Sequence, residues 1–201
     1  MANNVRNQLQ IYGDKRISQV IDEMISRLDK DNAATLADTG SVGRVLYGLS
    51  GNDAILGYDE IGAKWIYYDG GYWNQLVFTS GWSPARGLQD HIVEHLAKID
   101  PHAFSVLEYD DEMPNFVGVR IAYWDGTTVK CLEREVDTRD TKIVDDDELD
   151  EALAELQADG EDAEYEAVKT WDDVWDEQRG CRNFLVERAK ALFSWFPNDF
   201  A

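Results

Sequence analysis

The chain has 201 residues, of which 44% are hydrophobic and 11% aromatic, and it carries a formal net charge of −21. This length fits one domain, or one domain with a substantial extension, and the apolar content is ample for a packed core, which excludes a globally disordered chain. No stretch approaches the ~18 uninterrupted apolar residues of a membrane span, and the first residues lack a signal-peptide pattern, so we expect a cytoplasmic protein with no membrane partner. A surface this negative repels nucleic acid and favours cationic partners.

The chain contains two cysteines, Cys131 and Cys181, and neither lies in a C-x-x-C pair. In a cytosolic chain of this length, two cysteines are more often free thiols than a disulfide. We therefore expect free thiols.

The first residues predict a strand and then a helix. Residues 5–12 alternate with the period of two that is typical of a half-buried strand. One side of this strand would carry Val5, Asn7, Leu9 and Ile11, and the other Arg6, Gln8 and Gln10. Gly13 ends this pattern, and from Asp14, a residue that can cap a helix, apolar residues recur at helical spacing as far as Leu28. Residues 35–62 are rich in Gly, Ser and Asp, and we expect a long loop with minor helix or strand there.

The next segment predicts a hairpin followed by a helix. Residues 64–68 and 75–80 have the composition of two strands, joined across an Asp69-Gly70-Gly71 turn. Ser83-Pro84 predicts a helix start, with Ser as the N-cap and Pro at the first helical position. The helix is expected to end at Asp100-Pro101.

Three further strands are predicted at residues 104–109, 116–124 and 128–136, and Asp125-Gly126 between the last two is a strong hairpin signal. The resulting order is strand, helix, two strands, helix, strand, and then an added hairpin. This order predicts an α+β fold with a ferredoxin-like βαββαβ sheet that carries its helices on one face.

Past residue 140 the composition changes, so we expect a domain over residues 1–140 and an acidic helical extension, packed on or beside it, over residues 141–201. Residues 145–177 contain 16 Asp or Glu and one basic residue, so this block carries −15 of the total charge. A leucine stripe predicts a docked helix over residues 145–158, and a final helix is predicted over roughly 181–196.

Four short motifs stand out along residues 1–125: Met1–Gly13, Lys64-Trp65, Phe78–Pro84 and Pro114–Gly118. Together they resemble Api92-like proteins of phages and plasmids. The resemblance implies a ferredoxin-like domain and a gene from a mobile element, and it brings no catalytic residues. Small acidic proteins of such elements often interfere with host defence, which is an association and not a mechanism.

The acidic block is the first candidate site. If residues 145–159 are helical, their axis is ~22 Å long and bears one carboxylate per ~2.8 Å, within about a factor of two of the ~1.7 Å per charge of duplex DNA. Such a surface can compete for the basic channel of a nuclease or a guide-RNA effector. The alternatives are a solvated face that only aids solubility, and a calcium site, for which the spacing and the turn glycine of an EF-hand loop are missing. The predicted partner-binding residues are Asp145, Asp146, Asp147, Glu148, Asp150, Glu151, Glu155, Asp159, Glu161, Asp162, Trp171, Asp172, Asp173, Trp175 and Asp176.

Trp171 and Trp175 supply the aromatic part of this candidate. They lie four residues apart, with Val168 expected on the same helical face. Tryptophan anchors interfaces because it buries a large area at little entropic cost, and with the acidic block it would form an apolar centre with a charged rim. The alternative is that both rings pack on the body of the protein itself.

His91-Ile92-Val93-Glu94-His95 matches the H-x-x-E-H pattern of inverted zinc proteases. The spacing places both imidazoles on one side of a helix, with Glu94 as a possible base, and a third ligand would have to come from elsewhere. An amphipathic surface helix explains the same residues more simply, because its apolar positions claim the buried face.

A cluster of rings around the central hairpin is a further candidate, since aromatic side chains on a sheet can stack on RNA bases. Few basic residues lie near them, so packing in the core and on the sheet is the favoured interpretation. These residues are Tyr67, Tyr68, Tyr72, Trp73 and Trp82.

The sequence therefore predicts a non-catalytic inhibitor from a phage or plasmid. It would dock its acidic, tryptophan-bearing face onto the basic nucleic-acid-binding surface of a host defence complex, in the manner of an anti-CRISPR or anti-restriction nucleic-acid mimic. We expect no cofactor, no metal and no direct contact with nucleic acid, and a monomer or weak homodimer. The alternatives are a zinc-dependent hydrolase that uses His91, Glu94 and His95, and a self-associating accessory phage protein.

Overall fold

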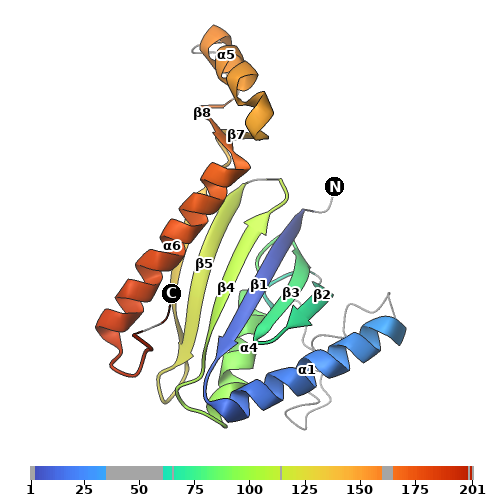
Figure 1. The fold of residues 1–201 in the computed structure, drawn as a ribbon, viewed down its shortest axis with the longest axis vertical. Coiled ribbons are helices and arrows are strands. Elements are labelled where there is room, and N and C mark those ends of the chain that lie inside the picture. Colours follow the sequence, from blue (N-terminus) through green and yellow to red (C-terminus); the bar gives the residue numbers. More distant parts are fainter. Residues whose placement is uncertain are drawn as a thin grey trace.

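A six-stranded antiparallel sheet runs through the centre of the protein (Figure 1). The computed structural model describes residues 3–34, 61–64, 66–113, 115–159, 165–198 and 200, without the side chains of residues 30–34 and 159, so most of the loop predicted over residues 35–62 lies outside it. The strands are β1 (Asn4–Tyr12), β2 (Ile66–Tyr72), β3 (Gln75–Gly81), β4 (Phe104–Asp111), β5 (Phe116–Trp124) and β6 (Val129–Asp137). They lie in the order β2-β3-β1-β4-β5-β6.

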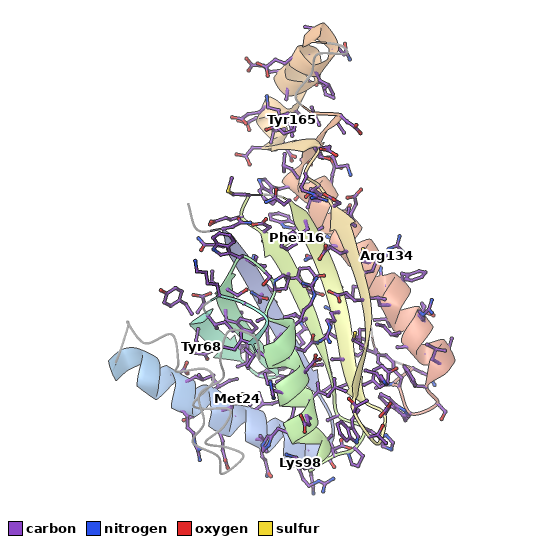
Figure 2. All side chains as sticks on the ribbon, turned by 180° about the vertical axis from the view of Figure 1, so that it is seen from behind. Met24, Tyr68, Lys98, Phe116, Arg134 and Tyr165 are labelled. Carbon is purple, nitrogen blue, oxygen red and sulfur yellow. The ribbon has the colours of Figure 1, made fainter. Side chains whose placement is uncertain are left out.

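Helices cover both faces of this sheet. Helices α1 (Lys15–Ala34) and α4 (Arg86–Ala97) pack on one face, and α6 (Trp171–Leu192) packs on the other, as the two opposite views show (Figures 1 and 2). The α+β class is confirmed. The two helices that fall within the predicted βαββαβ order, α1 and α4, lie on one face as expected, and α6, which belongs to the predicted extension, covers the other face. None of the helices in the described part of the chain is long and apolar enough to cross a membrane.

The alternation of side chains along the strands builds two separate cores. On the first face Leu9 of β1 and Leu107 of β4 pack among the apolar residues of α1 and α4, and Figure 2 shows Met24 and Tyr68 on this side. On the second face Val106 of β4 meets α6. Because β4 and β5 carry apolar residues on both faces, an amphipathic helix has to cover the second one. This is why the final helix, predicted over 181–196, instead begins at Trp171 and runs the length of the sheet.

The β2–β3 hairpin turns later than predicted. Its turn residues are Trp73 and Asn74, and β2 continues through Asp69-Gly70-Gly71 with a shift in register between Tyr68 and Gly70. Asp69 is the extra residue at this shift and Gly70 has φ 148°, so Asp69-Gly70 forms a bulge in the strand rather than a turn, and Gly71 pairs with Leu76. By contrast, the β5–β6 hairpin at Asp125-Gly126 is confirmed, with Asp125 Oδ1 accepting the backbone N–H groups of residues 127 and 128.

The predicted N-cap of α4 is also wrong. The Ser83 hydroxyl donates to the carbonyl oxygen of Gly62 at 2.5 Å, and the N-cap residue is Ala85, which has no side-chain cap. The buried amide of Asn7 takes over part of this role, because its Oδ1 accepts the Ala85 N–H at 3.1 Å. Its Nδ2 donates to Ser80 Oγ at 2.8 Å, so one side chain ties β1, β3 and the start of α4 together.

A buried ionic network fixes α4 on β5 and β6. Arg120 lies in an apolar run of β5, and its guanidinium, 7% exposed, bonds Asp90 at 2.7 Å and the Gln89 side chain at 2.7 Å. Nearby, the Tyr109 hydroxyl donates to Glu133 at 2.7 Å. Burial, and next the Glu133 carboxylate, raise the pKa of Tyr109 above its ordinary value. Paired in this way, the charges are satisfied within the fold.

The Tyr109 ring lies directly over Gly118 of β5, where a Cβ would come within 2.4 Å of the ring. Since the ring is fully buried and cannot move aside, we expect Gly118→Ala to lower the free energy of unfolding by about 1–3 kcal/mol. The measurement is the urea midpoint of unfolding.

Gly180→Ala is the matched control for this substitution. Gly180 lies in α6 with no atom within 4 Å of an added Cβ, so alanine should raise the free energy of unfolding by up to ~1 kcal/mol through its helix propensity. Equal midpoints for Gly118→Ala and the unmodified protein would contradict the packing described.

Candidate partner-binding site

The acidic segment after β6 forms a small unit, here named the acidic arm, of which the structure describes residues 141–159 and 165–170. It contains β7 (Thr141–Val144), a 3₁₀ turn η1 (Asp146–Glu148), α5 (Leu149–Asp159) and β8 (Ala167–Thr170). β7 and β8 pair in parallel, which requires a crossover between them, and α5 lies in that crossover. Figure 1 shows the arm beyond the end of the sheet, next to the start of α6.

The helix predicted over residues 145–158 is present as η1 followed by α5. Its leucine stripe lies against the two short strands of the arm, with Ala152 and Val144 buried and Leu153 partly buried. The carboxylates of η1 and of the first turn of α5 lie at the helix start, where the backbone dipole favours negative charge. The apolar stripe therefore docks inside the arm, and the charged face is left to solvent.

Seven carboxylates of the arm are exposed: Asp145, Asp146, Asp147, Glu148, Asp150, Glu151 and Glu155. Glu155 pairs with Lys142 at 2.7 Å, and its hydrogen bond raises the pKa of the Lys142 ammonium above the ordinary value. Among the described residues the other six have no ion pair. Their side chains are exposed, and of the six Glu148 also interacts electrostatically with Lys142, so the arm presents a dense and mostly uncompensated anionic surface.

Trp171 and Trp175 lie at the start of α6, where the arm joins the body. Their ring centroids are 6.0 Å apart, and Trp175 is 43% exposed while Trp171 is partly buried. Val174, which lies between them in the sequence, is fully buried and belongs to the face of α6 that packs inward. The two indoles lie off this face, beside the arm. Val168, expected on the same helical face, instead belongs to β8, because the helix begins only after Thr170.

The other predicted residues on α6 have different roles. Asp173 forms a reciprocal capping box with Thr170, accepting the Thr170 N–H at 3.0 Å and donating its own N–H to the Thr170 hydroxyl at 3.2 Å. The bond from the Thr170 backbone lowers the pKa of the Asp173 carboxyl. Asp176 pairs with Arg179 at 3.0 Å, and Asp172 is exposed. The Asp159 side chain, Glu161 and Asp162 lie outside the described residues.

The zinc-binding alternative finds no third ligand in the part of the chain that the structure describes, which contains no group of three or more potential ligands. His91 and His95 are partly buried on α4, and Glu94 is exposed. Burial, with a contribution from Lys98, lowers the pKa of His95.

Packing in the core, the interpretation favoured for the rings around the central hairpin, is confirmed for Tyr68 and wrong for the other four, which are exposed. The exposed rings do not form one continuous platform either. Tyr68 is buried in the first core, whereas Tyr67 is exposed and, as its neighbour in the strand, points to the opposite face. Trp73 and Trp82 lie at opposite ends of β3. Cys131 is exposed and Cys181 is buried, and both are free thiols, as predicted.

Comparisons of the chain with protein-family models, with curated proteins and with solved structures find no match. The fold and the site define a class by their own geometry: an α+β protein with a projecting acidic arm whose charge is mostly uncompensated. Sequence reasoning found the carboxylates of this arm from their density. It missed the Thr170–Asp173 capping box, although a Thr followed three residues later by an acidic residue is its recognisable signal.

The capping box makes the junction between arm and body testable. Thr170→Ala removes the hydroxyl that accepts the Asp173 N–H and should destabilise the start of α6 by about 1 kcal/mol, seen as faster amide hydrogen exchange over residues 171–175. Thr170→Ser keeps the hydroxyl and serves as the control for the lost methyl group.

The same effect should depend on pH with a defined sign. The Thr170 backbone N–H, which both variants keep, and next the Thr170 hydroxyl, which donates to the Asp173 carboxylate at 3.1 Å, lower the pKa of Asp173. The stabilisation from the hydroxyl–carboxylate bond is complete above the unfolded pKa and is lost as the pH falls through the folded value. Lowering the pH should therefore reduce the difference in amide hydrogen exchange over residues 171–175 between Thr170→Ala and Thr170→Ser. Identical exchange in the Ala and Ser variants at neutral pH would contradict the cap.

Proposed function

We propose that this protein is a non-catalytic inhibitor that binds the basic nucleic-acid-binding surface of a host defence complex, such as a CRISPR effector or a restriction enzyme. The observation that carries the proposal is the acidic arm, with six exposed carboxylates that lack ion pairs among the described residues. Elsewhere many carboxylates have cationic partners, for example Glu133 with Arg86. A dense and uncompensated anionic surface attracts clustered Lys and Arg side chains.

The spacing of charge supports mimicry of a nucleic acid. Residues 145–159 hold eight carboxylates. Seven of them lie in η1 and α5, which rise about 2 Å and about 1.5 Å per residue, so they occur at roughly one per 3.2 Å, against about one per 1.7 Å along duplex DNA. A protein channel that binds phosphates through counterion release would gain from the arm in the same way. The arm projects beyond the sheet (Figure 1), so it can enter a concave basic channel.

The tryptophan pair supports a contact with a protein rather than simple solubility. Trp175 is 43% exposed and lies 6.0 Å from Trp171, beside the arm. Burying an exposed indole at the centre of an interface contributes affinity that charge alone does not, and the carboxylates would form the polar rim.

The finer description of the fold belongs to the same proposal. The order β2-β3-β1-β4, with α1 and α4 on one face, supports a ferredoxin-like unit to which the β5–β6 hairpin, α6 and the arm are added. A phage or plasmid origin rests on the Api92-like motifs in residues 1–125. Both agree with a small cytoplasmic inhibitor that folds on a common scaffold and carries its function on an added element.

The proposal is tested by neutralising the arm. Asp146→Asn, Asp147→Asn and Glu151→Gln remove three exposed charges from the arm, and Glu23→Gln, Glu94→Gln and Glu187→Gln remove three exposed charges from the body as a matched control. Each protein is immobilised and used to capture partners from a nuclease-treated bacterial lysate. Captured proteins are then assayed for binding to their own DNA or RNA by gel shift.

We expect the unmodified protein and the control to capture a basic nucleic-acid-binding complex and to block its gel shift, and the arm variant to do neither. Raising the salt from about 50 mM to about 200 mM should weaken binding by roughly tenfold or more, because exposed charges are screened. Capture that is equal for the arm variant and the control, or insensitive to salt, would reduce the arm to a solubility feature.

A further inference from the structure

A second candidate surface lies at the end of the sheet opposite the acidic arm. The arm follows β6, whose last residue Asp137 pairs with Phe116 at the start of β5, whereas Tyr12 at the end of β1 pairs with Phe104 at the start of β4. At this second end the structure contains a hollow of about 600 Å³. That volume is within the range of ligand sites, and none of the functions considered above uses it.

Three pairs of stacked rings contribute walls to this hollow. Tyr12 stacks on Phe104 with centroids 5.0 Å apart, and His102 stacks on Trp195 at 5.5 Å. The third pair is Tyr72 on Trp73, at 5.4 Å and 12° between the ring planes. Stacking limits the rotation of each ring, so the walls are organised before any ligand binds.

Trp73 occupies a position that its side chain does not favour. Its φ is 55°, in the left-handed region that Asn and Gly adopt more readily, at a hairpin turn where those two residues are preferred. It is also 74% exposed. An indole therefore lies at the rim of the hollow although its backbone conformation is strained and its apolar surface is exposed to water. This combination is found at binding sites.

The carboxylates that line the hollow are Asp22 and Asp100, and Arg16, which interacts electrostatically with Asp100, is not part of the lining. Asp22 of α1 is exposed at its edge. Asp100 is buried, and its carboxylate is held by the Asp14 N–H at 2.9 Å and the His102 N–H at 3.0 Å. Among the described residues that line the hollow there is no Lys or Arg. Ring faces combined with carboxylates select a cation, because each attracts positive charge.

The hollow continues on both sides. It shares Asp22 and Trp73 with a hollow of about 540 Å³ along α1, and it shares His102 and Trp195 with one of about 770 Å³ that reaches the β5–β6 turn. Such a row of hollows fits an extended chain better than an isolated small molecule.

We propose that this end of the sheet binds an arginine side chain of an extended peptide, with the guanidinium against the ring of Trp73 and near the carboxylates of Asp22 and Asp100. A planar guanidinium can stack on an aromatic face and pair with a carboxylate at the same time, which an ammonium group does less well. The flanking hollows take the neighbouring peptide residues. This inference does not rest on the acidic arm or on the function proposed for it.

The test uses the peptide Gly-Ser-Arg-Ser-Gly with blocked ends, its citrulline counterpart and arginine amide as probes. Citrulline has the shape of arginine without its charge. Binding to the full chain is followed by nuclear magnetic resonance of the tryptophan indole N–H groups, with the signals of Trp73 and Trp195 assigned by substitution. We expect the arginine peptide to shift these two signals in a saturable way, and the citrulline peptide to bind at least about fivefold more weakly.

Two variants with matched controls identify the residues. Trp73→Asn should weaken binding of the arginine peptide by roughly tenfold, and Asp22→Asn by about threefold. Trp82→Asn removes an exposed tryptophan that also has positive φ, at the far end of β3, and Glu23→Gln removes the next charge on α1. Both variants should leave the affinity within about twofold. Because Asn tolerates positive φ, the melting temperature of Trp73→Asn should be no lower than that of the unmodified protein, so lost binding cannot be attributed to unfolding.

Equal binding of the arginine and citrulline peptides would overturn the selection for a cation. Arginine amide that binds as tightly as the peptide would overturn the assignment to an extended chain. Unchanged affinity in Trp73→Asn would overturn the site itself. None of these results would bear on the acidic arm, which lies at the other end of the molecule (Figure 1).

Discussion

The burial of β4 and β5 on both faces is the constraint on which the rest of this structure depends. Val106 and Val119 face one side and are fully buried there, while Leu107 is fully buried on the other. A strand pair of this kind is stable only when both of its faces are covered. Helix α4 covers the first face, and α6 has to cover the second. A helix of 22 residues is about 33 Å long, which is enough to follow these strands from end to end.

The length of α6 places both candidate surfaces. Its start carries Trp171 and Trp175 to one end of the sheet, where the acidic arm joins it. After its end, the chain folds back so that Phe200 packs on Phe104 and Tyr12, and Trp195 reaches the hollow at the other end. One surface is a charged arm and the other is a hollow lined by aromatic rings. The position of both is set by α6, which packs along the second core.

The distribution of charge follows from the same division. In the body, carboxylates beside the sheet have guanidinium partners, such as Glu108 with Arg182 and Glu135 with Arg86. In the arm, the repulsion among neighbouring carboxylates works against folding. Among the described residues it is opposed by a small apolar core, the β7–β8 pairing, the Lys142–Glu155 and Lys169–Glu177 ion pairs and the cap at Thr170. Cations or a basic partner that bind the arm would screen this repulsion and would therefore also stabilise its folded form.

Much of the main sheet could be predicted from the sequence, because its signals are local. The alternation in β1 and the Asp125-Gly126 turn each act within a few residues. The position of the β2–β3 turn could not be predicted in this way. Asp69-Gly70 is compatible with a bulge as well as with a turn, and the pairing with β3 decides between them. The hollow was missed for a similar reason: Tyr12, Trp73 and Trp195 are far apart in the sequence and meet only in the fold.

Trp73 and Trp82, which both have positive φ, show how the fold can hold a ring in place at a strained position. The Lys64 ammonium lies over the ring of Trp82, with Nζ 4.8 Å from the ring centroid. The ring of Trp73 is stacked on Tyr72. These contacts offset part of the backbone strain, and they also reduce the freedom that each indole has in solvent. A ring whose orientation is already restricted loses less entropy when a ligand covers it. At Trp73, the restricted and exposed ring would therefore lose little entropy when the proposed arginine peptide covers it, whereas the backbone strain is the same in the free and the bound protein.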